Sequence, residues 1–284
     1  FFKQKTAYET IGVTGVQTCA LPIYAAGVVG REDGRDGSRM TSASPLSMIT
    51  GTRAPIAVAL DAPDSQTMVN WASQTAQHVS VMKVGLEVYL RDGADAVAKV
   101  REAAPEAGLF LDLKLHDIPA TVAGAARSVA RLQPEILTVH AAGGTAMIAA
   151  AADALPNTLI AGVTILTSMS SSDLAAVGFN GDARTCVQRL ARLAVGAGAR
   201  ALVCSPLEVA FVRDVVGPDV LLITPGVRPL GADVNDQRRV ATPQQALADG
   251  ADLLVIGRPI TAAADPAAAA LAIAQGLTGR HDAA

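Results

Sequence analysis

The chain has 284 residues, a length at which one parallel α/β barrel of about 200–250 residues fits as a single domain. Hydrophobic residues make up 50% of the sequence and charged residues 17%, which excludes intrinsic disorder as the main state. A net charge of −3 and an aromatic content of 3% disfavour a nucleic-acid-binding protein, and no apolar run reaches the roughly 18 residues of a membrane span.

Residues 1–39 show neither a helical nor a strand period, and they end in the polar run REDGRDGSR. The stretch KQKTAYETIGVTGVQTCALPI resembles translated sequencing-adaptor read-through. We therefore expect residues 1–39 to be a non-native or disordered extension and residues 40–54 to lead into the folded part, with Met40 or Met48 as the natural start.

From residue 55 onward, short β-rich apolar runs alternate with longer Ala-rich segments of helical period, as in βα units around a parallel sheet. Eight runs are predicted strands: Ile56–Leu60, Val81–Val84, Leu109–Leu113, Ile136–Val139, Leu159–Ile165, Ala201–Val203, Val220–Ile223 and Leu253–Ile256. Helix-length segments separate them, among them Asp64–His78, Ala120–Leu132, Arg184–Gly196 and Thr242–Asp249.

This rhythm predicts an α/β fold, a single-domain (β/α)8 TIM barrel over residues 55–275, with a flexible tail at 276–284. An open doubly wound sheet is the alternative. It is disfavoured because no G-x-G-x-x-G turn follows the first strand.

Charged residues stand near the carboxyl ends of the first three predicted strands, where barrel enzymes carry catalytic groups. They are Asp61, Lys83, Asp112 and Lys114. Because side chains alternate along a strand, Asp112 and Lys114 share one face and are expected to point into the barrel mouth. Burying an unpaired charge is costly, so the four groups are expected to form a mutually compensating array. A purely structural salt-bridge network is the alternative.

Flanking carboxylates favour the protonated form of Lys114, which suits a proton donor better than a Schiff-base nucleophile. Two histidines follow neighbouring strands. For His116 a structural hydrogen bond is the favoured interpretation, whereas His140 either lines the site or packs beside it.

A second group of residues predicts an anion site after strands seven and eight, the usual phosphate site of such barrels. Gly257 permits close backbone approach, and Arg258 can bind two phosphate oxygens at once. Arg228 lies in the Pro/Gly-rich stretch TPGVRPLGADVNDQRR, in which residues 226–239 are long enough to act as a lid.

Together these motifs resemble the orotidine 5′-phosphate decarboxylase family over roughly residues 55–275. They are VALD (58–61), KVG (83–85), FLDLKLHDIPATV (110–122), VTILTSM (163–169), TPGVRP (224–229), DQRR (236–239) and IGRPI (256–260). The D-x-K-x-x-D block followed by HDIP is the most specific of them. The resemblance implies conversion of orotidine 5′-monophosphate (OMP) to UMP and CO2 in pyrimidine biosynthesis, without a metal or organic cofactor. A cytoplasmic location is expected on other grounds, because polar residues interrupt the apolar stretch after Lys3 and Lys5 before a signal-peptide core of useful length develops.

The resemblance also implies roles for the matching residues. Asp61 and Lys83 are implied to contact the ribose hydroxyls, with Lys83 also part of the charge array. Asp112, Lys114 and Asp117 are implied to form the catalytic set, in which Lys114 stabilises the carbanion left at C6 and then protonates it. Repulsion between Asp112 and the substrate carboxylate is expected to favour departure of CO2.

The implied active form is a homodimer, in which Asp117, Ile118 and Thr121 reach the neighbouring subunit's site. The remaining implied contacts are Thr167 and Pro225 at the pyrimidine, and Arg228, Gln237, Gly257 and Arg258 at the 5′-phosphate and its closing loop. One departure is Ala120, where the family often has Asn.

Two other functions fit parts of this pattern. Metal-dependent sugar-phosphate decarboxylases or aldolases of the same barrel group share D-x-K-x-x-D but carry a carboxylate ligand at the end of strand two, where this chain has Lys83. A non-catalytic nucleotide-phosphate binder is expected to have lost a catalytic charge, yet all four charges are present. Three cysteines, Cys19, Cys186 and Cys204, show no metal-ligand spacing and are expected to be non-functional thiols of a reducing compartment.

Overall fold

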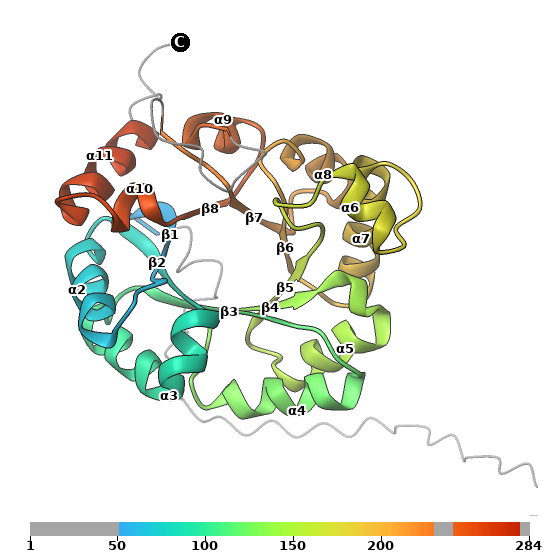
Figure 1. Ribbon diagram of the computed structural model, residues 1–284, viewed down its shortest axis with the longest axis horizontal. Coiled ribbons are helices and arrows are strands. Elements are labelled where there is room, and N and C mark those ends of the chain that lie inside the picture. Colours follow the sequence, from blue (N-terminus) through green and yellow to red (C-terminus); the bar gives the residue numbers. More distant parts are fainter. Residues whose placement is uncertain (1–50, 230–240, 279–284) are drawn as a thin grey trace, which may run out of the picture. The chain divides into compact units, whose positions relative to one another are not determined.

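The computed structural model describes residues 51–229 and 241–278, which contain an eight-stranded parallel barrel (Figure 1). The strands are β1 (Ala54–Ala59), β2 (Val79–Gly85), β3 (Gly108–Leu115), β4 (Ile136–His140), β5 (Leu159–Val163), β6 (Ala201–Val203), β7 (Leu221–Pro225) and β8 (Leu253–Ile256). Each strand pairs with the next, and β8 closes the barrel on β1. The predicted closed barrel is confirmed, and the open-sheet alternative is wrong.

The helices form a ring around the strands (Figure 1). They are α2 (Ser65–Thr75), α3 (Leu86–Ala103), α4 (Pro119–Ala130), α5 (Thr145–Ala154), α6 (Ser171–Ala176), α7 (Ala183–Gly196), α8 (Val209–Val216), α9 (Pro243–Ala248), α10 (Arg258–Thr261) and α11 (Pro266–Thr278), with a 3-10 turn, η1, at Ala141–Gly143. Within the described part of the chain, no helix is long and apolar enough to cross a membrane.

Local capping chemistry sets where several helices begin. The side chains of Asp64, Asp182 and Thr242 accept hydrogen bonds from backbone N–H groups three residues ahead, at the starts of α2, α7 and α9. Each such cap stabilises its helix by about 1 kcal/mol. The predicted segments that begin at Asp64 and Thr242 therefore include the capping residue, and the helices proper start one residue later.

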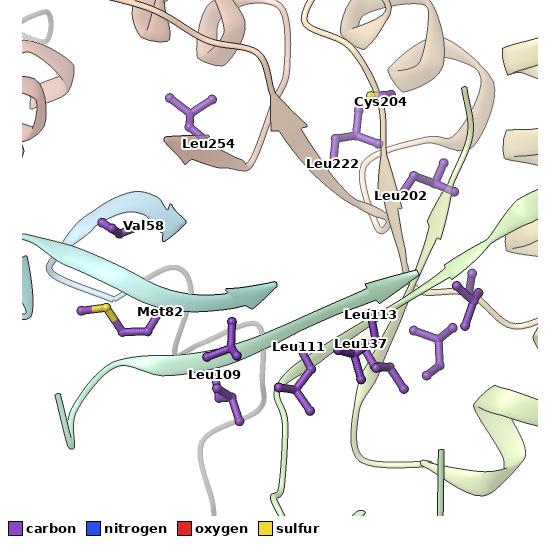
Figure 2. Close-up of a cluster of buried hydrophobic side chains, with 14 of the residues drawn as sticks. Val58, Met82, Leu109, Leu111, Leu113, Leu137, Leu202, Cys204, Leu222 and Leu254 are labelled. Carbon is purple, nitrogen blue, oxygen red and sulfur yellow. The ribbon is translucent and has the colours of Figure 1, made fainter. Parts of the chain in front are cut away.

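Two hydrophobic clusters follow from the alternation of side chains along the strands. Phe110, Val81 and Ile136 belong to the cluster inside the barrel. A larger cluster lies between strands and helices, and Figure 2 shows part of it, including Leu109 and Leu111 of β3. Fully burying each of these large side chains stabilises the fold by about 1.5–3 kcal/mol.

The same alternation carries polar residues into the barrel mouth. Asp112 lies two positions beyond Phe110, and Lys83 lies two positions beyond Val81, so each shares the inward face of its strand. The fold therefore places a charged layer directly above an apolar one.

Some predictions fall on parts of the chain that are not described. These are the extension at 1–39, the start at Met40 or Met48, Gln237 with most of the 226–239 loop, and residues 279–284 of the predicted tail; all lie outside the described residues. Residues 276–278, which were predicted as part of that tail, are the last residues of α11.

Candidate active site

Four charged side chains form an alternating row at the carboxyl ends of β1, β2 and β3. The Nζ atom of Lys83 lies 3.3 Å from Asp61 Oδ1 and 3.3 Å from Asp112 Oδ2. The other oxygen of Asp112, Oδ1, lies 2.8 Å from Lys114 Nζ. The row therefore reads acid, base, acid, base, which is the compensating array that the sequence predicts.

The array is most buried at its centre. The side chains of Lys83 and Asp112 are 7% and 13% exposed, whereas those of Asp61 and Lys114 are 48% and 30% exposed. The outer two groups are thus open to a bound molecule, while the inner two hold them in place. Each buried charge has a partner of opposite sign, which offsets the cost of its burial.

Asp112 remains ionised in this setting. Burial by itself raises the pKa of Asp112, but Lys83 and Lys114 together with hydrogen bonds from Lys114 and Thr138 outweigh it, so the pKa lies below its usual value. A negative charge is therefore fixed beside the Lys114 ammonium at neutral pH.

Gly85 ends β2 beside the array, and its lack of a side chain matters. A Cβ atom at this position would lie 2.5 Å from Asp61 Oδ1 and 3.0 Å from Lys83 Nζ. Any larger residue would therefore push the first two charges out of line. The motif KVG includes this glycine, but the reason why a glycine is needed there is visible only in the fold.

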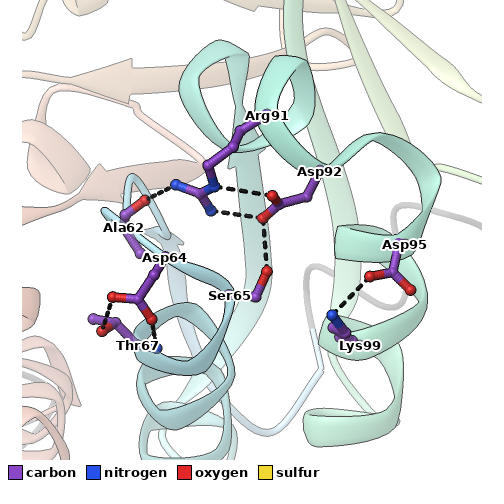
Figure 3. A network of polar contacts seen from close by, with 8 residues as sticks. All are labelled: Ala62, Asp64, Ser65, Thr67, Arg91, Asp92, Asp95 and Lys99. Carbon is purple, nitrogen blue, oxygen red and sulfur yellow. Dashed lines mark hydrogen bonds and ion pairs between the residues drawn. The ribbon is translucent and has the colours of Figure 1, made fainter.

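The loop that carries Asp61 is tied to α3 (Figure 3). Arg91 Nη1 donates to the carbonyl oxygen of Ala62 at 2.6 Å, and its guanidinium pairs with Asp92 at 2.7 Å. Asp92 in turn accepts from Ser65 Oγ at 2.8 Å. These contacts fix the segment that follows β1, and no sequence motif predicted them.

Two adjacent cavities open at this end of the barrel and share Asp112, Lys114, Pro225 and Val255. The larger, of about 440 Å³, contains the whole charge array and also Arg228, Gly257 and Arg258. The smaller, of about 180 Å³, is mainly apolar, and its other lining residues are Phe110, Val163, Ile165, Leu166, Thr167, Val203 and Cys204. A hollow of about 720 Å³ lies elsewhere, beside Ala54 and His78, and none of the charge array lines it.

The structure thus brings together nine of the sequence-predicted site residues around two joined cavities, one charged and one apolar. They are Asp61, Lys83, Asp112, Lys114, Thr167, Pro225, Arg228, Gly257 and Arg258. Arg228 is buried, and its backbone N–H donates to Ala241 O at 2.9 Å, so these two described residues lie side by side. What each residue does in a reaction stays a prediction.

Three predicted residues lie apart from the cavities. Asp117, Ile118 and Thr121 are exposed at the start of α4, and Asp117 Oδ1 accepts a hydrogen bond of 2.6 Å from the N–H of Ile118. None of the three lines either cavity within one chain.

The two histidines pack against each other, with ring centroids 5.3 Å apart. Burial lowers the pKa of His140, and the charges of His116 and Lys114 lower it further, against an opposing effect of Asp112. His140 is therefore neutral at neutral pH. Neither ring lines either cavity, so His140 packs beside the site rather than lining it.

The described thiols are Cys186 and Cys204, both buried and free. Cys204 lines the smaller cavity, yet burial raises its pKa, so it is a neutral thiol and a poor nucleophile. Cys19 lies outside the described residues.

Comparisons with known proteins agree with the geometry. The model of the orotidine 5′-phosphate decarboxylase / HUMPS family matches residues 54–273. The chain is 67% identical over 224 residues to an orotidine 5′-phosphate decarboxylase of Thermobifida fusca, covering 79% of this chain and 96% of the relative. It is 51% identical over 260 residues to one of Frankia casuarinae, covering 86% and 95%.

A solved structure gives the same result. The crystal structure of an orotidine 5′-phosphate decarboxylase from Lactobacillus acidophilus matches with a TM-score of 0.70 and 35% identity. The match covers 79% of this chain and 99% of that chain. The similarity therefore spans the barrel and the strand ends that carry the charge array.

Proposed function

Because this chain belongs to the orotidine 5′-phosphate decarboxylase / HUMPS family, we propose that it decarboxylates OMP to UMP and CO2, a step of pyrimidine biosynthesis. The observation that carries the proposal is the array of Asp61, Lys83, Asp112 and Lys114, which stands where a charged and an apolar cavity meet. A cytoplasmic location belongs to the same proposal.

The two cavities match the two ends of this substrate. The phosphate binds at Arg228, Gly257 and Arg258, where two guanidinium groups and a glycine can surround an anion. The pyrimidine enters the apolar cavity beside Thr167 and Pro225. The ribose then lies between them, within reach of the outer charges of the array.

The reaction needs a cation beside C6 of the pyrimidine. The bond between C6 and the carboxylate carbon breaks, CO2 leaves, and the electron pair stays on C6. The fixed ammonium of Lys114 stabilises that negative charge and then transfers a proton from Nζ to C6, which gives UMP. Water returns a proton to the amine afterwards.

Asp112 has two functions in this account. It orients the Lys114 ammonium through the 2.8 Å contact between Oδ1 and Nζ. Its negative charge also lies on the side of the ring where the substrate carboxylate departs, and repulsion there favours loss of CO2. Binding energy from the remote phosphate offsets this repulsion.

Lys83 disfavours the metal-dependent sugar-phosphate chemistry that other members of this barrel group carry out. It stands at the end of β2, where those enzymes place a carboxylate ligand, and its ammonium lies 3.3 Å from a carboxylate on either side. A fixed cation at this position repels Mg²⁺. The site is therefore suited to chemistry that uses the lysines themselves.

The active form is proposed to be a homodimer. Asp117, Ile118 and Thr121 are exposed and lie outside the cavities of their own chain, and Ile118 presents an apolar side chain that is 66% exposed. The family resemblance assigns these three residues to the neighbouring subunit's site, and their exposure leaves them accessible to a second copy of the chain. Asp117 then completes the charge array of the neighbouring subunit.

The test is to follow the ultraviolet absorbance of OMP mixed with the purified chain, with EDTA present. Loss of OMP and appearance of UMP under these conditions support the proposal. No loss of OMP, or a loss that requires added Mg²⁺, contradicts it and favours the metal-dependent relatives.

A further inference from the structure

The backbone of Lys114 has a strained conformation that neighbouring contacts must stabilise. Its φ is +48°, in the left-handed region that residues with a Cβ seldom adopt. The pairing of β3 with β4 shifts at this point, from Leu111 opposite Leu137 to Leu115 opposite Val139. Three residues of β3, 112 to 114, therefore stand opposite one residue of β4, Thr138.

Thr138 fills the gap that this bulge leaves in the ladder. The backbone N–H of Lys114 donates to Thr138 Oγ1 at 2.8 Å, in place of a carbonyl of the neighbouring strand. The hydroxyl of Thr138 donates in turn to Asp112 Oδ1 at 3.0 Å. The same oxygen of Asp112 accepts from Lys114 Nζ at 2.8 Å.

These three hydrogen bonds close a ring that contains both ends of Lys114. Its backbone N–H and its ammonium are each held, one by Thr138 and the other by Asp112, and Thr138 links the two. The Thr138 side chain is completely buried, so water does not compete for its hydroxyl. Thr138 lines neither cavity, so it does not belong to the surface that meets a substrate.

We propose that Thr138 is a positioning residue, whose hydroxyl holds the Lys114 bulge and the Asp112 carboxylate in the geometry required for decarboxylation. The inference rests on the proposed function, because it concerns the same reaction. Neither the family resemblance nor the strand-end pattern assigned a role to this residue.

The first test is Thr138→Val, which keeps the shape of the side chain but removes its donor and acceptor. Losing a hydrogen bond to a charged group is expected to lower kcat for OMP by about 10- to 100-fold. The dissociation constant of UMP is expected to change little, because the residues proposed to bind the phosphate and the pyrimidine, such as Arg228 and Thr167, are not among the groups that Thr138 holds. Thr138→Ser keeps the hydroxyl and is expected to retain most of the kcat.

Thr158→Val is the matched control. The hydroxyl of Thr158 is also buried, and it donates to the carbonyl oxygen of Pro134 at 2.8 Å, just before β5 begins. This variant loses a hydrogen bond of the same kind away from the array. It is expected to lower Tm while leaving kcat unchanged.

The outcomes separate positioning from a general structural role. A kcat loss in Thr138→Val with wild-type UMP affinity, restored in Thr138→Ser, supports the inference. Wild-type kcat in Thr138→Val overturns it, as does a parallel loss of kcat, UMP affinity and Tm that Thr158→Val reproduces. If Thr138→Val does not fold, Thr138→Ala removes the same hydroxyl and the same criteria apply.

Failure of the wild-type chain to convert OMP differs from the outcomes that test Thr138 alone. It refutes the proposed function, and the inference about Thr138 falls with it. A wild-type chain that is active, with a Thr138→Val variant equally active, refutes only the role of Thr138.

Discussion

Replacing Lys83 with Met removes the cation between Asp61 and Asp112 while keeping most of the side-chain volume. Removing one partner of a buried ion pair costs about 3–5 kcal/mol, because the other charge stays buried. Here Asp112 retains Lys114 at 2.8 Å, and the Asp61 side chain is 48% exposed to water. We therefore expect the lower end of that range, about 3 kcal/mol.

This loss of stability should depend on pH. In the wild-type chain the pKa of Asp112 lies below the 3.8 of an ordinary aspartate, so its ionised form contributes stability above that value, which is lost as the pH falls through the folded-state pKa. In Lys83→Met the lysine charge no longer counteracts the effect of burial on Asp112, so the pKa of Asp112 rises. The destabilisation should thus be largest near neutral pH and smaller below the pKa of an unfolded aspartate.

The assay is urea unfolding followed by the fluorescence of Trp71, the one tryptophan of the chain, at neutral and at acid pH. The reasoning is refuted if the free energy of unfolding falls by the same amount at both pH values. It is also refuted if the loss at neutral pH is below about 1 kcal/mol, the range of an exposed ion pair.

Three further predictions concern activity. Gly85→Ala should lower kcat/KM for OMP by roughly 10- to 100-fold in steady-state assays, because the added Cβ displaces Asp61, and unchanged kinetics would contradict this. Arg228→Ala should lower kcat/KM for OMP by about 10- to 100-fold but leave activity on unphosphorylated orotidine unaltered; an equal loss on both substrates would exclude a phosphate contact. Mixing inactive Lys114→Ala and Asp117→Ala chains under conditions of subunit exchange should restore activity. In each mixed dimer, one of the two sites regains both an intact Lys114 and an intact Asp117 from the other chain. No restoration of activity would place Asp117 in its own chain's site.

The barrel could be predicted from the sequence because each strand carries its own local pattern. Apolar runs such as LLVI at 253–256 are bounded by turn residues, and their number and spacing leave few topologies. The charge array followed from the same pattern, since the period of two places Asp112 and Lys114 on the inward face.

The supporting contacts could not be predicted in this way. Thr138 meets Asp112 across 26 residues of sequence, and Arg91 meets Ala62 across 29. The bulge at Lys114 depends on how β3 pairs with β4, which no local pattern specifies. One sequence signal could have pointed to Thr138. It is a polar residue two positions beyond Ile136, on the inward face of the fourth strand.

The most direct test of the account compares the wild-type chain with Lys114→Ala in two measurements, OMP turnover in EDTA and UMP affinity. The account predicts that the wild-type chain turns over OMP in EDTA and that the variant loses at least roughly 100-fold in kcat, as expected when a proton donor is removed. UMP affinity should stay near the wild-type value, because the phosphate and pyrimidine contacts remain. A Lys114→Ala variant with wild-type kcat would contradict the central claim that this ammonium stabilises and protonates C6.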